Sequence, residues 1–331
     1  MTRIPLQTIE DKVPGFRYIP VICGPTGGGK SAVANELCRM TGGELVSCDS
    51  MQIYKGLDIG TAKPSAEEQQ EIRHHLIDIV EPDRSFSVND FLQCCFEAID
   101  DILSRGVLPV LCGGTGQYIS ALRDGIRYVD EPVPEELISR LYSEYERSEE
   151  DKDRIYKELC DADPEAAAKI HRNNTRRVVR ALAVYKATGK TFTKWNEESK
   201  KTGPMFPFML FEPDYEECRD ILYSRINRRV DQMMEQGLTS EADSLYKKHT
   251  DRSSTAFQAI GYKEFAPYID GKEGYDLDKV SYDIKLNTRH YAKRQLTWFR
   301  YIDDIVKLRW DEDPGVNAGI IIRNIRAANI P

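Results

Sequence analysis

The sequence lacks the features that mark membrane or exported proteins. Hydrophobic residues make up 40% of its 331 residues, yet no run approaches the ~18 consecutive apolar residues of a membrane-spanning helix. The first sixteen residues include acidic Glu10 and Asp11 and no apolar segment of signal-peptide length. We therefore expect a soluble chain of about two domains that works in the cytoplasm without a membrane partner.

Paired cysteines are also missing. The eight cysteines never form a Cys-x-x-Cys pair, which argues against a zinc site or a disulfide framework. Most lie in apolar contexts, so we interpret them as buried free thiols. The sequence also contains no internal repeat and no low-complexity tract.

Acidic residues are absent from two stretches of an otherwise acidic chain. The net charge is -8, but residues 169–194 hold eight basic residues and residues 285–300 hold five, with no Asp or Glu in either stretch. Both stretches include or adjoin aromatic residues, such as Tyr185 and Trp298. Two solvated helix faces would be the plain interpretation. The combination favours a binding surface for a polyanion such as a nucleic acid.

Short apolar runs alternate with helical patterns in the first part of the chain. Residues 18–23, 44–48 and 107–112 are typical of buried parallel strands, and residues 31–40 and 88–105 show helical periodicity. This alternation predicts an α/β fold with a doubly wound parallel sheet.

A helical insertion is expected to interrupt this sheet. Residues 134–147, 151–160, 164–170 and 175–188 predict successive helices, and residues 205–212 predict a strand that returns to the sheet. We therefore assign 17–124 and 204–331 to a catalytic core and 125–203 to an inserted domain. Further helices are expected at 215–236, 239–248, 257–268 and 277–301, with a possible edge strand at 305–310.

A glycine-rich segment follows the first predicted strand and opens the first predicted helix. Its residues fit the pattern G-x-x-x-x-G-K-[ST] and are Gly24, Pro25, Thr26, Gly27, Gly28, Gly29, Lys30 and Ser31. Successive backbone N–H groups in such a P-loop surround an anion at a helix N-terminus. Lys30 adds a charge for the terminal phosphate, and the Ser31 hydroxyl is placed to bind Mg²⁺. The motif predicts a diphosphate or triphosphate site without identifying the molecule.

Two other predicted strands end in residues suited to the same site. Asp49 follows the second strand, and Thr115 lies in a Gly-Gly-Thr-Gly loop after the third. Because the carboxyl ends of parallel strands open onto one crevice, we expect these residues to face the bound phosphates. Asp49 could be a Mg²⁺ ligand, a general base or a cap for the following turn.

The segment 49–64, DSMQIYKGLDIGTAKP, makes the sequence recognisable when it is combined with GPTGGGKS. Together with AIGYK at 259–263 and TRHYAKRQLTW at 288–298, it closely resembles the tRNA dimethylallyltransferases, and the likeness covers residues 18–302. The resemblance implies transfer of a dimethylallyl group from its diphosphate to the exocyclic amine of the adenosine 3' to the tRNA anticodon.

The resemblance also implies roles for individual residues. The P-loop would hold the donor diphosphate with Mg²⁺, Asp49 would act as the general base, and Thr115 and Lys30 would complete the catalytic set. The target base would be flipped out of the anticodon loop toward the tRNA-binding residues Asp49, Ser50, Met51, Gln52 and Thr115. The insertion and the carboxy-terminal helices would grip the anticodon stem-loop of a tRNA, and we expect the protein to bind it as a monomer. The candidate contacts there are Arg176, Arg177, Arg180, Arg289, Lys293 and Arg294.

Three other functions remain open from the residues alone. A P-loop kinase would use Lys30 and Mg²⁺ on ATP, and an adenylate isopentenyltransferase would prenylate a free nucleotide instead of tRNA. A non-catalytic RNA-binding domain that binds nucleotides is the third possibility.

Overall fold

The chain folds into two compact units. The computed structural model describes residues 7–126, 133–200, 203–249, 252 and 254–328. One unit combines residues 1–121 with 205–331, and the other consists of residues 122–204. The first unit contains the sheet, whereas the described part of the second is helical.

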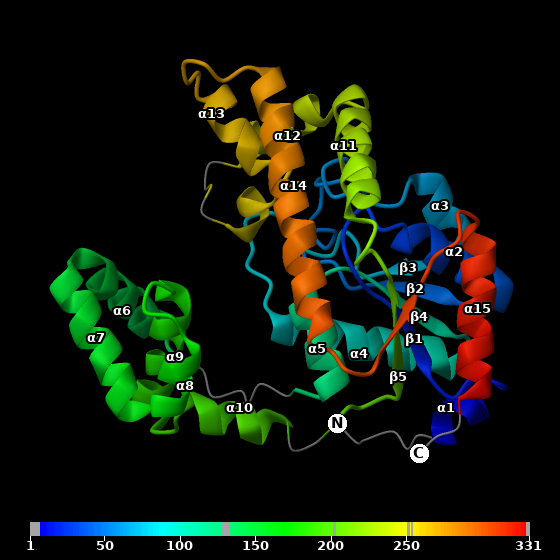
Figure 1. The fold of residues 1–331 in the computed structure, drawn as a ribbon, viewed down its shortest axis with the longest axis horizontal. Coiled ribbons are helices and arrows are strands. Elements are labelled where there is room, and N and C mark those ends of the chain that lie inside the picture. The colour runs from blue at the N-terminus through cyan, green and yellow to red at the C-terminus, as the bar shows by residue number, and fades with distance from the viewer. Residues whose placement is uncertain (1–6, 127–132, 201–202, 250–251, 253, 329–331) are drawn as a thin grey trace. The chain divides into compact units, whose positions relative to one another are not determined.

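A parallel six-stranded sheet forms the centre of the first unit, which confirms the predicted fold class (Figure 1). Its strands are β1 (Ile19–Ile22), β2 (Glu44–Ser47), β3 (His74–His75), β4 (Pro109–Cys112), β5 (Phe208–Pro213) and β6 (Ile305–Leu308). Their order across the sheet is β3-β2-β4-β1-β5-β6. Because β4 lies between β1 and β2, the loops that leave these three strands emerge side by side.

The helices that belong to this sheet layer are α1 (Gln7–Lys12), α2 (Lys30–Thr41), α4 (Val88–Ser104), α5 (Gly116–Asp124) and α15 (Pro314–Ala327). Helix α4 begins with a capping box, in which Ser87 and Asp90 exchange hydrogen bonds between side chain and backbone. Its buried face includes Phe91, Cys95 and Ile99 at helical spacing. Helix α15 packs against α2 (Figure 1).

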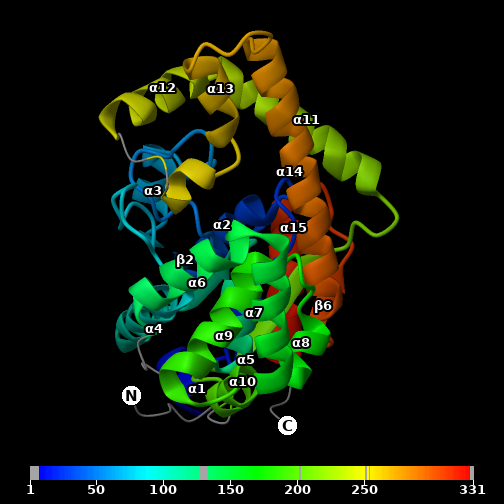
Figure 2. The same ribbon diagram turned by 90° about the vertical axis from the view of Figure 1, so that its left-hand side faces the viewer.

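A second apolar cluster joins the segment after β2 to the carboxy-terminal helices. Helices α11 (Arg219–Glu235) and α14 (Leu277–Arg300) contact each other, and α12 (Leu238–Lys248) follows α11 (Figure 2). The cluster includes Tyr54 and Leu57 from the loop after β2, Leu245 from α12, and Tyr262 and Phe265. This packing holds the loop after β2 against α12. The short helix α3 (Ala66–Glu71) follows that loop.

The unit of residues 122–204 has its own apolar core. Its helices are α6 (Glu135–Arg147), α7 (Glu149–Ala162), α8 (Pro164–Lys169), α9 (Thr175–Thr188) and α10 (Phe192–Lys200). Leu141, Ile155 and Leu182 are fully or nearly fully buried in that core, and the Tyr145 hydroxyl donates to the carbonyl of Arg172. Helix α10 was not predicted, and residues 201–202, at the end of the expected insertion 125–203, lie outside the described residues.

The prediction of one helix over residues 257–268 is wrong. The segment instead forms two 3-10 turns, η1 (Thr255–Gln258) and η2 (Lys263–Phe265), and the short helix α13 (Ala266–Ile269). Gly261 has a φ of +98°, a left-handed conformation that interrupts an α-helix. The backbone N–H of Gly261 donates to the Glu264 side chain, whereas in a helix it would donate to a backbone carbonyl.

The prediction of free cysteine thiols is confirmed. All eight cysteines are free, and five of them are buried, but Cys218 is exposed, contrary to the expectation of burial. Among the described residues, no helix is both long enough and apolar enough to cross a bilayer.

Candidate active site

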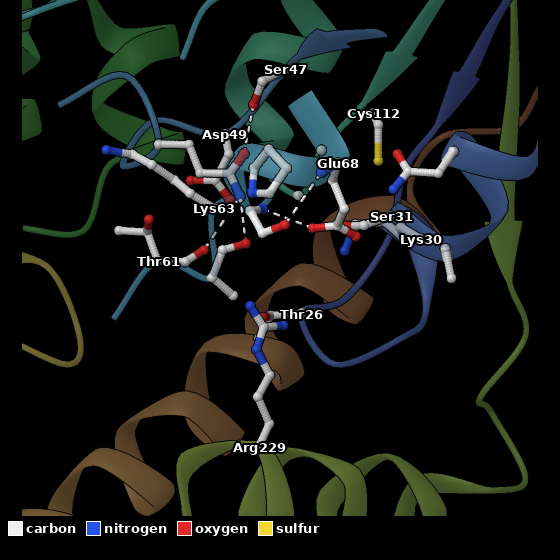
Figure 3. A pocket seen from close by; sticks show the side chains of 18 of the residues that line it. Thr26, Lys30, Ser31, Ser47, Asp49, Thr61, Lys63, Glu68, Cys112 and Arg229 are labelled. Atoms are coloured by element: carbon white, nitrogen blue, oxygen red, sulfur yellow. Dashed lines mark hydrogen bonds between the residues drawn. The ribbon is translucent and has the colours of Figure 1, made fainter. Parts of the chain in front are cut away.

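The carboxyl ends of β1, β2 and β4 open onto a cavity of about 1000 Å³ in the first unit (Figure 3). Thr26 to Ser31 line one part of it, and Gly113 and Gly114 line the part after β4. Asp49, Gln52 and the segment 58–66 form another part, and α11 contributes Arg225, Arg228 and Arg229. The cavity therefore combines elements from the whole length of the first unit.

Glycine is required at several positions of the phosphate loop. Gly24, Gly27 and Gly29 have φ values of +124°, +75° and +83°, which L side chains rarely adopt. A Cβ atom on Gly27 would also lie 2.8 Å from the Ile226 side chain of α11. Helix α2 begins directly after Gly29, so its free N–H groups and its dipole face the cavity.

The Lys30 side chain is held inside the phosphate loop by a hydrogen bond to the backbone of that loop. Its Nζ donates to the Pro25 carbonyl at 2.8 Å. Burial lowers the pKa of Lys30, whereas nearby Cys112 and Asp49 act in the opposite direction. Ser31 is exposed at the start of α2 and lines the same cavity. The lysine is thus a preorganised cation for an anionic ligand.

Asp49 faces this cavity from the end of β2. One of its oxygens, Oδ1, accepts from the backbone N–H of Met51 at 2.9 Å, so the side chain does cap the following turn. Its charge acts on Lys30 and on Arg229. Asp49 and the phosphate loop therefore share one cavity, as expected from the strand ends.

The residues next to Asp49 divide between the cavity and the surrounding structure. Gln52 lines the cavity, whereas Met51 packs against the second apolar cluster. The backbone N–H of Ser50 donates to the Thr115 hydroxyl at 3.0 Å, and the Ser50 and Thr115 hydroxyls lie 3.3 Å apart. Thr115 thus links the ends of β2 and β4.

Gln295 of α14 ties two of the loops together. The buried side chain accepts from the Thr26 N–H and donates to the Gly114 carbonyl, each at 2.8 Å. A Cβ atom on Gly114 would lie 2.2 Å from Gln295 Nε2, which explains the glycine. Gln295 lies in the motif at 288–298, but its role could not be predicted because its two partners are distant along the chain.

Arginines from α11 form a cationic wall that was not predicted from the sequence. Arg229 projects toward the cavity opposite Asp49 (Figure 3). Burial lowers the pKa of Arg229, and the charge of Asp49 opposes this effect. Arg225 donates to the Tyr215 hydroxyl, which in turn donates to the Gly28 carbonyl. The only sequence signal was their i, i+4 spacing on one helix.

Tyr291 of α14 also belongs to this neighbourhood. Burial raises the pKa of the Tyr291 phenol, and the charge of Asp49 raises it further. The side chains of Thr115 and Gln295 act in the opposite direction and lower this pKa. A protonated phenol therefore lies near the candidate base.

The basic residues expected to contact tRNA differ in their surroundings. Arg176, Arg177 and Arg180 are exposed on α9. On α14, Lys293 and Arg294 are exposed, and Arg294 lies 5.6 Å from the centre of the Tyr291 ring. Arg289 is instead half-buried and donates to Asn227 at 2.6 Å. That contact occupies part of its guanidinium group.

A P-loop that shares a cavity with a carboxylate at the end of another strand of the same parallel sheet defines a phosphate-binding α/β protein of the P-loop class. The model of the IPP transferase family matches residues 52–301, and the chain belongs to this family. This confirms the resemblance stated from the sequence motifs.

Individual relatives cover nearly the whole chain. The tRNA dimethylallyltransferase of Acetivibrio thermocellus is 44% identical over 292 residues, which is 88% of this chain and 91% of the relative. That of Geobacillus thermodenitrificans is 45% identical over 282 residues, 85% of this chain and 87% of the relative.

Solved structures agree with these sequences. The tRNA isopentenylpyrophosphate transferase of Bacillus halodurans has 39% identity and a TM-score of 0.66, covering 93% of this chain and 95% of its own. A eukaryotic dimethylallyltransferase acting on tRNA has 31% identity and a TM-score of 0.77, covering 93% and 80%.

Proposed function

We propose that the protein transfers a dimethylallyl group from dimethylallyl diphosphate to the exocyclic amine of the adenosine 3' to the tRNA anticodon. The observation that carries this proposal is the shared cavity of the phosphate loop and Asp49. A cavity of about 1000 Å³ has room for both a small diphosphate and a purine. The names of the relatives supply the reaction class.

The donor diphosphate binds in the phosphate loop. The N–H groups at the start of α2 and the Lys30 ammonium face its oxygens, and Arg229 adds charge from the opposite wall. These groups stabilise the negative charge that grows on the departing diphosphate. Burial removes water from the charged groups of Lys30 and Arg229. A bound anion compensates both residues for this lost hydration.

The acceptor amine attacks the first carbon of the dimethylallyl group as the bond from that carbon to the diphosphate oxygen breaks. The electron pair of the broken bond leaves with the diphosphate. The amine is a weak nucleophile because its lone pair is delocalised into the adenine ring, so losing a proton during attack assists the reaction. Asp49 accepts this proton, while Thr115 fixes the loop that carries Asp49 through its bond to the Ser50 N–H.

The site fits Mg²⁺ bound mainly through the substrate. No group of three or more His, Cys, Asp or Glu residues suited to a metal occurs among the described residues. Mg²⁺ usually takes one or two protein ligands and completes its shell with phosphate oxygens and water. The exposed Ser31 hydroxyl beside the phosphate loop supplies such a ligand. When bound, the ion would neutralise charge on the diphosphate.

The first test is Asp49→Ala. We expect turnover to fall about 10²- to 10⁴-fold, with tRNA and donor affinities retained, because the residue acts on the proton and not on the phosphates. The assay measures prenyl transfer to tRNA under saturating conditions. Asp83→Asn, at an exposed acidic residue, is the matched control. Full turnover of Asp49→Ala would remove the assigned base.

Substrate competition tests the alternatives. Consumption of ATP with no consumption of dimethylallyl diphosphate would indicate a kinase. Preference for AMP over tRNA as the acceptor would indicate an adenylate isopentenyltransferase. We expect transfer to tRNA alone.

A further inference from the structure

A carboxylate of α12 binds the backbone of the loop after β2. The Glu241 side chain accepts hydrogen bonds from three successive backbone N–H groups, those of Asp58 at 3.1 Å, Ile59 at 2.9 Å and Gly60 at 3.1 Å. The Tyr262 hydroxyl donates to the same carboxylate at 2.6 Å. Successive N–H groups that converge in this way form an anion-binding nest. Here the anion comes from the chain itself.

The Tyr262 side chain restricts the backbone of this loop to one path. Its side chain is fully buried, and a Cβ atom on Gly60 would lie 2.6 Å from its ring. The loop backbone therefore lies directly against the ring, and only glycine fits at position 60. Burial and the charge of Glu241 raise the pKa of Tyr262, so its hydroxyl remains protonated and donates to the carboxylate.

The opposite face of the same loop is a wall of the cavity. Thr61, Ala62 and Lys63 line it together with Gln52. The Gln52 amide donates to the carbonyls of Thr61 at 3.3 Å and Ala62 at 3.2 Å. Its oxygen accepts from the Ser47 hydroxyl at 2.9 Å, at the end of β2. Gln52 is thus fixed by the wall that Glu241 supports.

This wall includes a strained residue. Ala62 has a φ of +48°, a left-handed conformation that costs a non-glycine residue about 1–2 kcal/mol. Such strain persists only where the surrounding structure fixes the backbone. The hydrogen bonds from Asp58, Ile59 and Gly60 to Glu241 lie just before Ala62 and provide that restraint on the loop.

We propose that Glu241 is a positioning residue for the acceptor nucleoside. It sets the place of the wall formed by Thr61 to Lys63, and through this wall the place of Gln52, next to Asp49. The donor site at the phosphate loop is built from α2, α11 and α14 and makes none of these contacts. Glu241 therefore acts on the tRNA substrate and not on the diphosphate. The inference rests on the proposed function.

The test compares Glu241→Gln with the parent protein. Replacing one carboxylate oxygen by an NH₂ group turns an acceptor into a donor that faces other donors. We expect kcat/KM for tRNA to fall about 10- to 100-fold, while KM for dimethylallyl diphosphate stays at the parent value. Tyr262→Phe, which removes one of the hydrogen bonds, should produce a smaller change in the same direction. Asp243→Asn, on the same helix and paired with Lys247, is the matched control.

Hydrogen–deuterium exchange gives a second measurement that does not depend on activity. The amides of residues 58–60 should exchange faster in Glu241→Gln than in the parent and in Asp243→Asn. Unchanged protection of these amides, or unchanged kinetics toward tRNA, would overturn the inference. A parallel loss of donor binding and of melting temperature would also overturn it, because that result indicates general destabilisation. If the parent protein itself transfers no prenyl group, the proposed function fails instead.

Discussion

Glu212 is a buried carboxyl that lies next to the phosphate loop. It lies near the end of β5 with 3% of its surface exposed. A Cβ atom on Gly24 would lie 3.1 Å from its Cγ. Burial raises the pKa of Glu212 to about 7, and Asp214 and Glu216 add to this effect, while Lys307 and Lys30 oppose it. An acid of this kind is largely neutral in the folded protein below pH 7.

This shift predicts a pH-dependent gain in stability for Glu212→Gln. In the unfolded chain the carboxyl ionises near its ordinary pKa of 4.5, so between pH 4.5 and 7 the folded state binds more protons. The stability of the parent therefore falls as the pH rises through this range and levels off above 7. Glutamine carries no such penalty.

We expect Glu212→Gln to match the parent near pH 4.5 and to exceed it above pH 7 by up to about 3 kcal/mol. Denaturant unfolding at several pH values measures the difference. Glu217→Gln, at an exposed position, is the control. A gap between Glu212→Gln and the parent that does not change with pH would contradict the assignment.

At the scale of elements, α14 closes the phosphate loop through Gln295. Replacing Gln295 by leucine leaves the Thr26 N–H and the Gly114 carbonyl without their partner. Unsatisfied buried groups of this kind cost about 1–3 kcal/mol each. We expect Gln295→Leu to lower the melting temperature and to raise KM for dimethylallyl diphosphate.

Thr297→Ala on the same helix is the control for Gln295→Leu, because the Thr297 hydroxyl bonds only to the Lys293 carbonyl within α14. Donor titrations by calorimetry and thermal melts of both variants separate the two effects. Parent-like donor affinity in Gln295→Leu would show that α14 does not support the loop.

The sequence predicted the elements whose signals are local. The apolar runs at 18–23, 44–48 and 107–112 correspond to β1, β2 and β4, and the helix expected at 175–188 has the bounds of α9. The two-residue strand β3 was missed because His74 and His75 form no apolar run. They belong to the sheet through pairing with β2. Helices α10 and α15 were also missed.

The residues that complete the site could not be found from spacing. Lys30 was identified from the P-loop pattern, and Asp49 was identified because it follows a strand. Arg229, Gln295 and Glu241 act across long sequence separations, and only the packing of α11, α12 and α14 brings them to the loops after β1 and β2. Gly60 and Gly261 were recognisable as parts of motifs. Their need for glycine follows from the Tyr262 ring and from a left-handed φ, respectively.

At the scale of the molecule, exposed cations occur in both compact units of an acidic chain. Arg176 and Arg180 lie on α9, and Lys293 and Arg294 lie on α14. If both pairs neutralise tRNA phosphates, each alanine pair reduces the slope of log affinity against log salt by roughly 1–2. We expect weaker tRNA binding at low salt for both pairs and unchanged donor affinity.

Filter binding over a range of salt concentrations measures these slopes. Lys279→Ala is the control on α14, because Lys279 already pairs with Asp283. A parent-like slope in one alanine pair would remove that helix from the tRNA surface. Arg289 is left out because its contact with Asn227 would mix a loss of packing with a loss of charge.

The bond between Thr26 and Gln295 spans 269 positions of the chain. Synthesis at about 5–20 residues per second separates the appearance of its two partners by roughly 15–50 seconds. During this interval a ribosome carries the phosphate loop without the helix that braces it. Competence for donor binding therefore belongs to the completed polypeptide, and a chain truncated before α14 lacks it even though its P-loop motif is intact.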